Sequence, residues 1–158
     1  MMFQRLTVSE FEQALLFRHG RFVRLLDPGA HWIRGEAVVV DVRRRDTHVD
    51  VAPVHTRDLV PVGVRLQVSY RVTDPKSAVL RSYDYRAHLV NDASAAVHRS
   101  FSEVPMAGLS AAHRTLEHQI HDRLSLEAAS YGLRVEDVAI LQVRFPRALR
   151  KKLKRMEV

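Results

Sequence analysis

The chain has 158 residues, a formal charge of +7, 46% hydrophobic residues and no cysteine. This length suits one domain that can bury a core of its own, and the missing cysteine excludes disulfides, thiolate nucleophiles and cysteine-based zinc sites. A charged fraction of 27% beside that apolar content excludes a disordered polyelectrolyte. The basic excess leaves three classes of partner open: nucleic acid, an anionic membrane surface and an acidic protein.

The first third of the chain is predicted to form short strands. Apolar runs at 14–17 and 22–26 flank a His-Gly pair, which is typical of a β-hairpin. Pro28 fixes φ and Gly29 permits a positive φ, so the pair predicts a type II turn at which the chain reverses. Further strands are expected at 36–42 and 46–51, on either side of three consecutive arginines.

The longest strand pattern lies at residues 58–72, where apolar and mostly polar side chains alternate six times. Pro61 confines its beginning to an edge or a strand start. We expect residues 60–72 to form a long exposed edge that could support self-association by strand addition. Residues 135–145 are apolar on both faces, so we expect them in the centre of the sheet, and Pro146 ends that strand.

Three helices are predicted between these two strands. Asp74 can cap the first, near 75–82, and Pro75 suits its first position. The second covers 85–101 and the third 110–131, each with apolar residues at helical spacing. Gly132 suits the left-handed position after a helix end. Strands followed by helices and a last strand indicate an α+β domain over residues 1–146.

Residues 147–158 form a basic tail that carries +5 of the total charge of +7. Its cations, opposed only by Glu157, are Arg147, Arg150, Lys151, Lys152, Lys154 and Arg155. Leu149, Leu153 and Met156 share one face of a helix, so the tail can lie on an anionic bilayer or engage an acidic partner. A solvated helix end, or the start of a longer helix, explains the pattern equally well.

The sequence contains no motif that supports an enzyme. It lacks a Gly-x-Ser-x-Gly nucleophile elbow, a glycine-rich phosphate loop and a His-Glu-x-x-His zinc motif, so we expect no catalytic residue and no cofactor. His118 and His121 fall on one helix face but have no third ligand, and we expect solvated side chains rather than a metal site. The basic tail leaves a nucleic-acid-binding module as the alternative function, which the low aromatic content of 7% disfavours.

An ordered set of segments resembles the stomatin/prohibitin/flotillin (SPFH, or band-seven) superfamily, most closely the stomatin-like slipins of bacteria. The segments are EQALLF at 12–17, LDPGAHW at 26–32, VDVR at 40–43, TRDLVPV at 56–62, YRVTDP at 70–75, YGLRVEDV at 131–138 and FP at 145–146. No single segment is specific, but their order over about residues 10–150 is. The positions that serve as structural landmarks of the resemblance are Pro28, Gly29, Asp58, Asp74, Pro75, Gly132 and Pro146.

The resemblance implies a curved, mainly antiparallel sheet with packed helices. It also implies a non-enzymatic scaffold that forms homo-oligomers, lies peripherally on the cytoplasmic side of a membrane and organises membrane proteins such as channels or proteases. The chain shows neither the N-terminal hydrophobic anchor nor the long C-terminal coiled coil that is usual in the family. We therefore expect either a domain excised from a longer protein or a short member that assembles differently.

Overall fold

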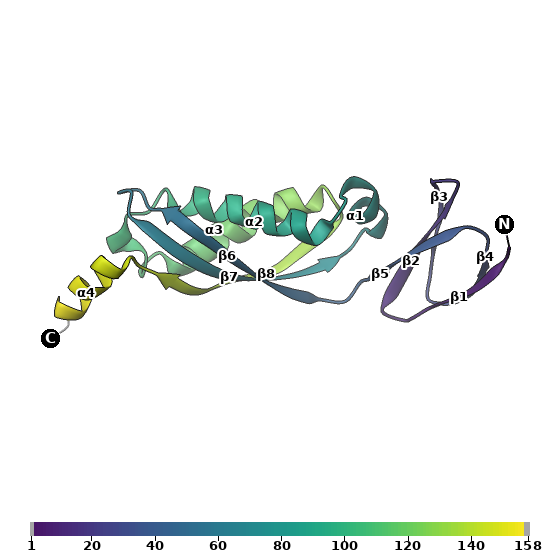
Figure 1. The fold of residues 1–158 in the computed structure, drawn as a ribbon, viewed down its shortest axis with the longest axis horizontal. Helices are drawn as coiled ribbons and strands as arrows, with labels where there is room; N and C mark the ends of the chain where they lie inside the picture. The colour runs from purple at the N-terminus through teal and green to yellow at the C-terminus, as the bar shows by residue number, and fades with distance from the viewer. Residues whose placement is uncertain (1, 157–158) are drawn as a thin grey trace.

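The computed structural model describes residues 2–156, and it confirms an α+β domain with antiparallel strand pairing (Figure 1). In chain order the elements are β1 (Gln4–Val8), β2 (Glu12–Arg18), β3 (Arg21–Leu26), β4 (Gly29–Ile33), β5 (Glu36–Asp41), β6 (Arg45–His55), β7 (Pro61–Val72), α1 (Pro75–Arg81), α2 (Tyr85–Phe101), the 3-10 helix η1 (Met106–Gly108), α3 (His113–Ala129), β8 (Leu133–Arg144) and α4 (Arg147–Met156). The strands divide into three sheets with the orders β1-β4, β3-β2-β5 and β6-β7-β8, a division that the sequence pattern did not predict.

The first hairpin is confirmed, but the next connection differs from the prediction. β2 pairs with β3 around His19 and Gly20, which both adopt positive φ. At Pro28 and Gly29 the predicted type II reversal is wrong, because β4 begins at Gly29 and pairs with β1 instead of β3. Gly29 has a φ of +133°, far from the value near +80° that a type II turn requires. The chain therefore bends here and passes to another sheet.

The two predictions about sheet position are also wrong. β7 lies between β6 and β8, so it is the central strand, and β8 is an edge. Alternation reports how many faces of a strand are covered, whereas the number of neighbouring strands depends on pairing with distant segments. The second apolar face of β8 is not fully covered either, since Leu141 remains 49% exposed. Strand addition at residues 60–72 is thereby excluded, because both sides of β7 are already paired.

The predicted helices are present with small shifts at their ends. The carboxylate of Asp74 accepts hydrogen bonds from the backbone N–H and hydroxyl of Ser77, and the carboxylate of Asp84 caps α2 by accepting from the backbone N–H of Ala87. α3 begins at His113 rather than at 110, because residues 109–112 form turns between η1 and the helix. α2 and α3 cover one face of the β6-β7-β8 sheet, and the main core lies between these two layers (Figure 1).

The molecule is elongated, and its two ends differ in structure. The two small N-terminal sheets lie at one end and α4 lies at the other, so the described termini are far apart (Figure 1). Leu15 and Val40 join the main core, while a second small core of Val8, Leu16 and Ile33 and their neighbours lies within the N-terminal sheets. A flat surface perpendicular to the long axis can therefore contact only one end of the molecule at a time.

Candidate membrane and assembly surfaces

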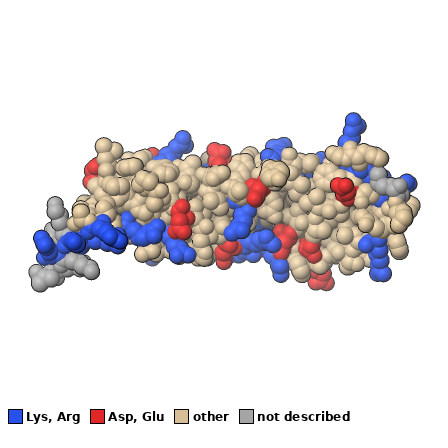
Figure 2. All heavy atoms as spheres, viewed as in Figure 1, with Lys and Arg blue, Asp and Glu red and all other residues tan. Residues whose placement is uncertain are grey.

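The C-terminal helix α4 is present where the sequence predicts it. It follows Pro146, whose carbonyl oxygen accepts a hydrogen bond from the backbone N–H of Arg150 at 3.0 Å. The side chains that the structure describes are exposed at Arg147, Arg150, Lys151 and Arg155, and Leu149 is half-buried. The predicted contact residues Lys152, Leu153 and Lys154 belong to the helix, but their side chains lie outside the described set. Figure 2 shows basic side chains gathered at this end of the molecule.

The opposite end carries exposed apolar side chains that the sequence pattern does not single out. We call Met2, Phe3, Arg5, Trp32 and Arg34 the N-terminal tip. Met2 is 88%, Phe3 63% and Trp32 69% exposed. Arg5 pairs with Trp32 across the β1-β4 ladder, and the Arg34 guanidinium lies 5.2 Å from the centre of the Phe3 ring. A tryptophan in a strand pattern is usually read as core, and only the pairing of two distant strands reveals this cluster.

Two of the family landmarks meet at one backbone crossing. Gly132 follows α3 with a φ of +75°, as predicted for the position after a helix end. Its carbonyl oxygen accepts hydrogen bonds from the backbone N–H groups of Thr73 and Asp74, at 2.9 and 3.1 Å. The end of α3 is therefore fastened to the residue that caps α1. Gly132 thus holds a structural position.

Asp58 holds the loop between β6 and β7 against η1. Its carboxylate accepts hydrogen bonds from the Thr56 hydroxyl and from the backbone N–H of Met106, the latter at 3.0 Å. These two donors hold the pKa of Asp58 below its usual range, the Thr56 hydroxyl contributing most. Like Gly132, Asp58 is thereby placed in a structural role.

Side chains of α3 occupy the free edge of β8. The Glu117 carboxylate accepts the backbone N–H of Ile140 at 2.8 Å, and Nε2 of His121 lies 3.1 Å from the carbonyl oxygen of Val135. Since a carbonyl oxygen only accepts, Nε2 must carry the proton in this contact. An unpaired edge invites strand addition, and these two contacts use part of its hydrogen-bonding capacity. Self-association through β8 is therefore obstructed as the structure stands.

Known proteins are similar to this chain over nearly all of its length. Residues 6–158 match the SPFH domain / Band 7 family. The chain belongs to this family. A stomatin homolog from Pyrococcus horikoshii is 29% identical over 94% of the chain, and a stomatin homolog from Pyrococcus abyssi is 29% identical over 91%. Stomatin-3 from Caenorhabditis elegans is 26% identical over 90% of the chain.

The SPFH domain described here spans little more than half of those relatives. It covers 57% of the P. horikoshii protein, 55% of the P. abyssi protein and 55% of the nematode protein. The family match confirms the superfamily. These relatives are archaeal and eukaryotic, so the bacterial slipin assignment stays a prediction. Within residues 2–156, no helix is long and apolar enough to cross a membrane.

Both histidines were expected to be solvated side chains, which is correct for His118 but wrong for His121, because His121 is half-buried between α3 and β8. His118 is exposed, and His121 contacts Val135 and the carboxylate of Asp122, its Nδ1 lying 3.3 Å from Oδ1. Among the residues that the structure describes, no group of three or more potential ligand side chains could hold a metal ion. The half-buried His121 therefore has a structural explanation in the SPFH domain, as a contact between α3 and β8.

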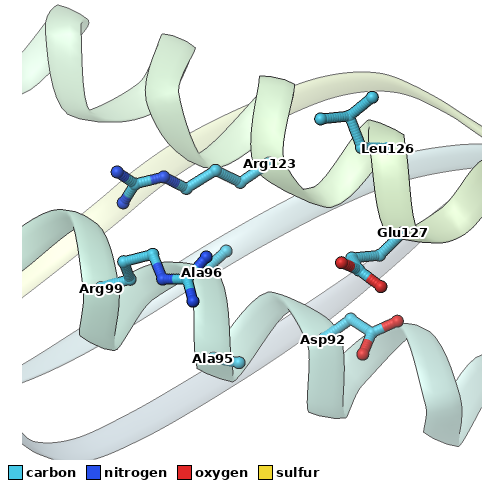
Figure 3. Close-up of a pocket in the computed structure, with 7 residues that line it drawn as sticks. All are labelled: Asp92, Ala95, Ala96, Arg99, Arg123, Leu126 and Glu127. Atoms are coloured by element: carbon cyan, nitrogen blue, oxygen red, sulfur yellow. The ribbon is translucent and has the colours of Figure 1, made fainter.

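A groove between α2 and α3 carries four charged side chains (Figure 3). Asp92 and Arg99 come from α2, and Arg123 and Glu127 come from α3. The Arg123 guanidinium donates to the buried Ser100 hydroxyl at 3.0 Å and to the Glu103 carboxylate at 2.9 Å. The sequence pattern does not single out these residues, because the charges become neighbours only when the two helices pack.

Replacing Glu117 by alanine is expected to lower the free energy of unfolding by about 1–3 kcal/mol, because the half-buried N–H of Ile140 loses its acceptor. Glu117→Gln keeps an acceptor oxygen and should cost less than half as much. Urea unfolding of the two variants measures both values. Equal losses in the two variants would show that the charge of Glu117, and not the hydrogen bond to β8, stabilises the fold.

Proposed function

We propose that this SPFH domain is a non-enzymatic scaffold that binds peripherally to the cytoplasmic surface of a membrane, self-associates and organises membrane proteins there. The observation that carries the proposal is the family match over residues 6–158. The name of the P. horikoshii relative, a stomatin homolog, points in the same direction. Channels and membrane proteases are the partner classes that we expect, and the slipin type is the expected subgroup.

The exposed helix α4 supplies one candidate contact with an anionic membrane. Each lysine or arginine close to such a surface contributes about 1 kcal/mol of attraction. Arg147, Arg150 and Lys151 are exposed, and α4 carries three further cations in its sequence. A half-buried Leu149 offers limited apolar insertion. Binding through α4 should therefore be dominated by charge and weakened by salt.

The N-terminal tip supplies a second candidate contact of different chemistry. Aromatic side chains favour the interface between headgroups and acyl chains, and the flanking arginines can reach lipid phosphates. Trp32 and Phe3 are more than half exposed, although apolar side chains of this size are usually buried. Binding through the tip should persist in salt, because it rests mainly on apolar burial.

Co-sedimentation with vesicles separates the two contacts, since they lie at opposite ends of the molecule (Figure 1). We expect wild type to bind vesicles that contain phosphatidylserine more tightly than vesicles of phosphatidylcholine alone. The triple variant R147A/R150A/K151A should lose about 100-fold in affinity at low salt, from about 1 kcal/mol per cation. The matched variant F3S/W32S should lose the binding that remains at high salt.

Failure of wild type to bind either vesicle would overturn the membrane part of the proposal. Binding to DNA or RNA with a steep salt dependence, lost in R147A/R150A/K151A, would favour the alternative of a nucleic-acid-binding module. Light scattering across concentration tests self-association, and a strict monomer would contradict that part alone. The three measurements therefore address the proposal in separable parts.

A further inference from the structure

The groove between α2 and α3 separates positive from negative charge along its length. Arg99 and Arg123 lie toward one end, and Asp92 and Glu127 lie toward the other (Figure 3). Asp92 and Arg99 are seven residues apart on α2, which corresponds to about 10 Å along the helix axis. The groove therefore has a cationic end and an anionic end, two helical turns apart.

Two of these four charges have a partner within the fold, and two are left available. Arg123 binds Ser100 and Glu103, and Asp92 accepts a hydrogen bond from the Tyr131 hydroxyl at 2.7 Å. Within the described part of the chain, neither Arg99 nor Glu127 forms a side-chain hydrogen bond or an ion pair with another side chain. Both are exposed, one at each end of the groove.

The groove also combines small and large apolar side chains. Ala95 and Ala96 lie on α2 between the charged ends, and Leu126 stands on α3 with 79% of its surface exposed (Figure 3). Leu126 stands at the end of the groove that carries Glu127, whereas Ala95 and Ala96 lie nearer Arg99 (Figure 3). The exposed apolar surface of Leu126 is available for burial when two such grooves meet face to face.

We propose that this groove binds the same groove of a second copy of the chain around a two-fold axis. The rotation exchanges the two ends of the groove and places Arg99 against the partner's Glu127. An isologous contact requires a self-complementary surface, and a patch whose positive end faces its own negative end after rotation meets that requirement. The inference rests on the self-association in the proposed function and names the surface that produces it.

The charges argue against other occupants of the groove. An anionic ligand would gain from Arg99 but would be repelled by Asp92 and Glu127, and a basic peptide would meet the converse penalty. A second copy satisfies both ends at once, because its cationic end lies against the anionic end of the first copy and its anionic end lies against the cationic end. Charge complementarity of the groove with itself is therefore the observation that selects the occupant.

The experiment reverses one charge at a time and then mixes the variants. R99E and E127R, each alone, place like charges together at both symmetric contacts, so we expect each to weaken self-association at least tenfold in sedimentation velocity at low salt. An equimolar mixture of R99E with E127R restores opposite charges at both contacts. That mixture should self-associate within about threefold of wild type, as a heterodimer.

The controls separate failure of this inference from failure of the proposed function. R114E reverses an exposed charge of α3 outside the groove and should leave self-association unchanged. If wild type self-associates while R99E, E127R and their mixture all behave as wild type does, the groove is not the interface and self-association uses another surface. If wild type stays monomeric, both proposals fall. Recovery in the mixture also excludes misfolding as the cause of loss in the single variants.

Discussion

Replacing Gly132 by alanine is expected to lower the free energy of unfolding by about 2–5 kcal/mol. A non-glycine residue in the left-handed region costs about 1–2 kcal/mol, and Gly132 has a φ of +75°. An added Cβ would also stand 2.2 Å from the carbonyl oxygen of Asp74, which is backbone and cannot rotate away. Forcing extra atoms into a packed site costs a further 1–3 kcal/mol, roughly.

Gly20 provides the matched control for this substitution. Its φ is +76°, nearly equal to that of Gly132, yet no atom outside its immediate neighbours lies within 4 Å of an added Cβ. Gly20→Ala should therefore show the strain alone, about 1–2 kcal/mol. Urea unfolding of both variants gives the difference, which reports the collision with Asp74. Equal losses would mean that the junction of α3 with α1 yields without cost.

Local chemistry explains which parts of this fold were predictable from sequence. The cap at Asp74, the proline after it and the glycine after α3 each act on their nearest neighbours in the chain, and the structure has them where the pattern placed them. The hairpin at His19 and Gly20 is local in the same sense. Such features need no knowledge of the rest of the fold.

Pairing between distant segments could not be predicted from such local features. β7 has one apolar face, which is equally compatible with an edge and a central position, and only its pairing with β8 decides the matter. β4 joins β1, more than twenty residues earlier, although a turn toward β3 looked natural at Pro28 and Gly29. Neither side-chain periodicity, which was used for β7, nor local turn chemistry, which was used at Pro28 and Gly29, carries information on strand order.

The candidate surfaces also divide into one that is formed by neighbouring residues and two that are formed by distant segments. Helix α4 was predictable, because charge and apolar spacing lie within one short segment. The N-terminal tip needs β1 beside β4, and the groove needs α2 beside α3, so neither Trp32 nor Glu127 could be selected from its own neighbourhood. Surfaces built by two elements are therefore where the structure adds most to the functional argument.

Tyr131 is expected to make the fold sensitive to alkaline pH. Its side chain is buried, its ring stacks on His88 with centres 3.9 Å apart, and its hydroxyl donates to the Asp92 carboxylate at 2.7 Å. Burial and, next, the hydrogen bond to Asp92 raise the pKa of Tyr131 far above its ordinary value. The phenol therefore keeps its proton in the folded state at a pH where the unfolded chain loses it.

The sign of the effect follows from proton binding. Above about pH 10 the unfolded chain releases the Tyr131 proton and the folded protein does not, so raising the pH favours unfolding. This contribution to stability is complete below pH 10 and falls by up to about 1.4 kcal/mol for each pH unit above it. Burial also raises the pKa of Tyr70, which adds to the slope in the same direction.

The variant Tyr131→Phe isolates the part that belongs to Tyr131. At pH 8 it should be less stable than wild type by about 1.5–3 kcal/mol, the range for a hydrogen bond to a charged group. Its stability should then decline less steeply between pH 10 and 12, because Tyr70 remains and Tyr131 no longer titrates. Urea unfolding at successive pH values should therefore show the two curves converging above pH 11. Parallel curves would mean that Tyr131 ionises in the folded protein as it does in the unfolded chain, and that the contact with Asp92 opens without cost.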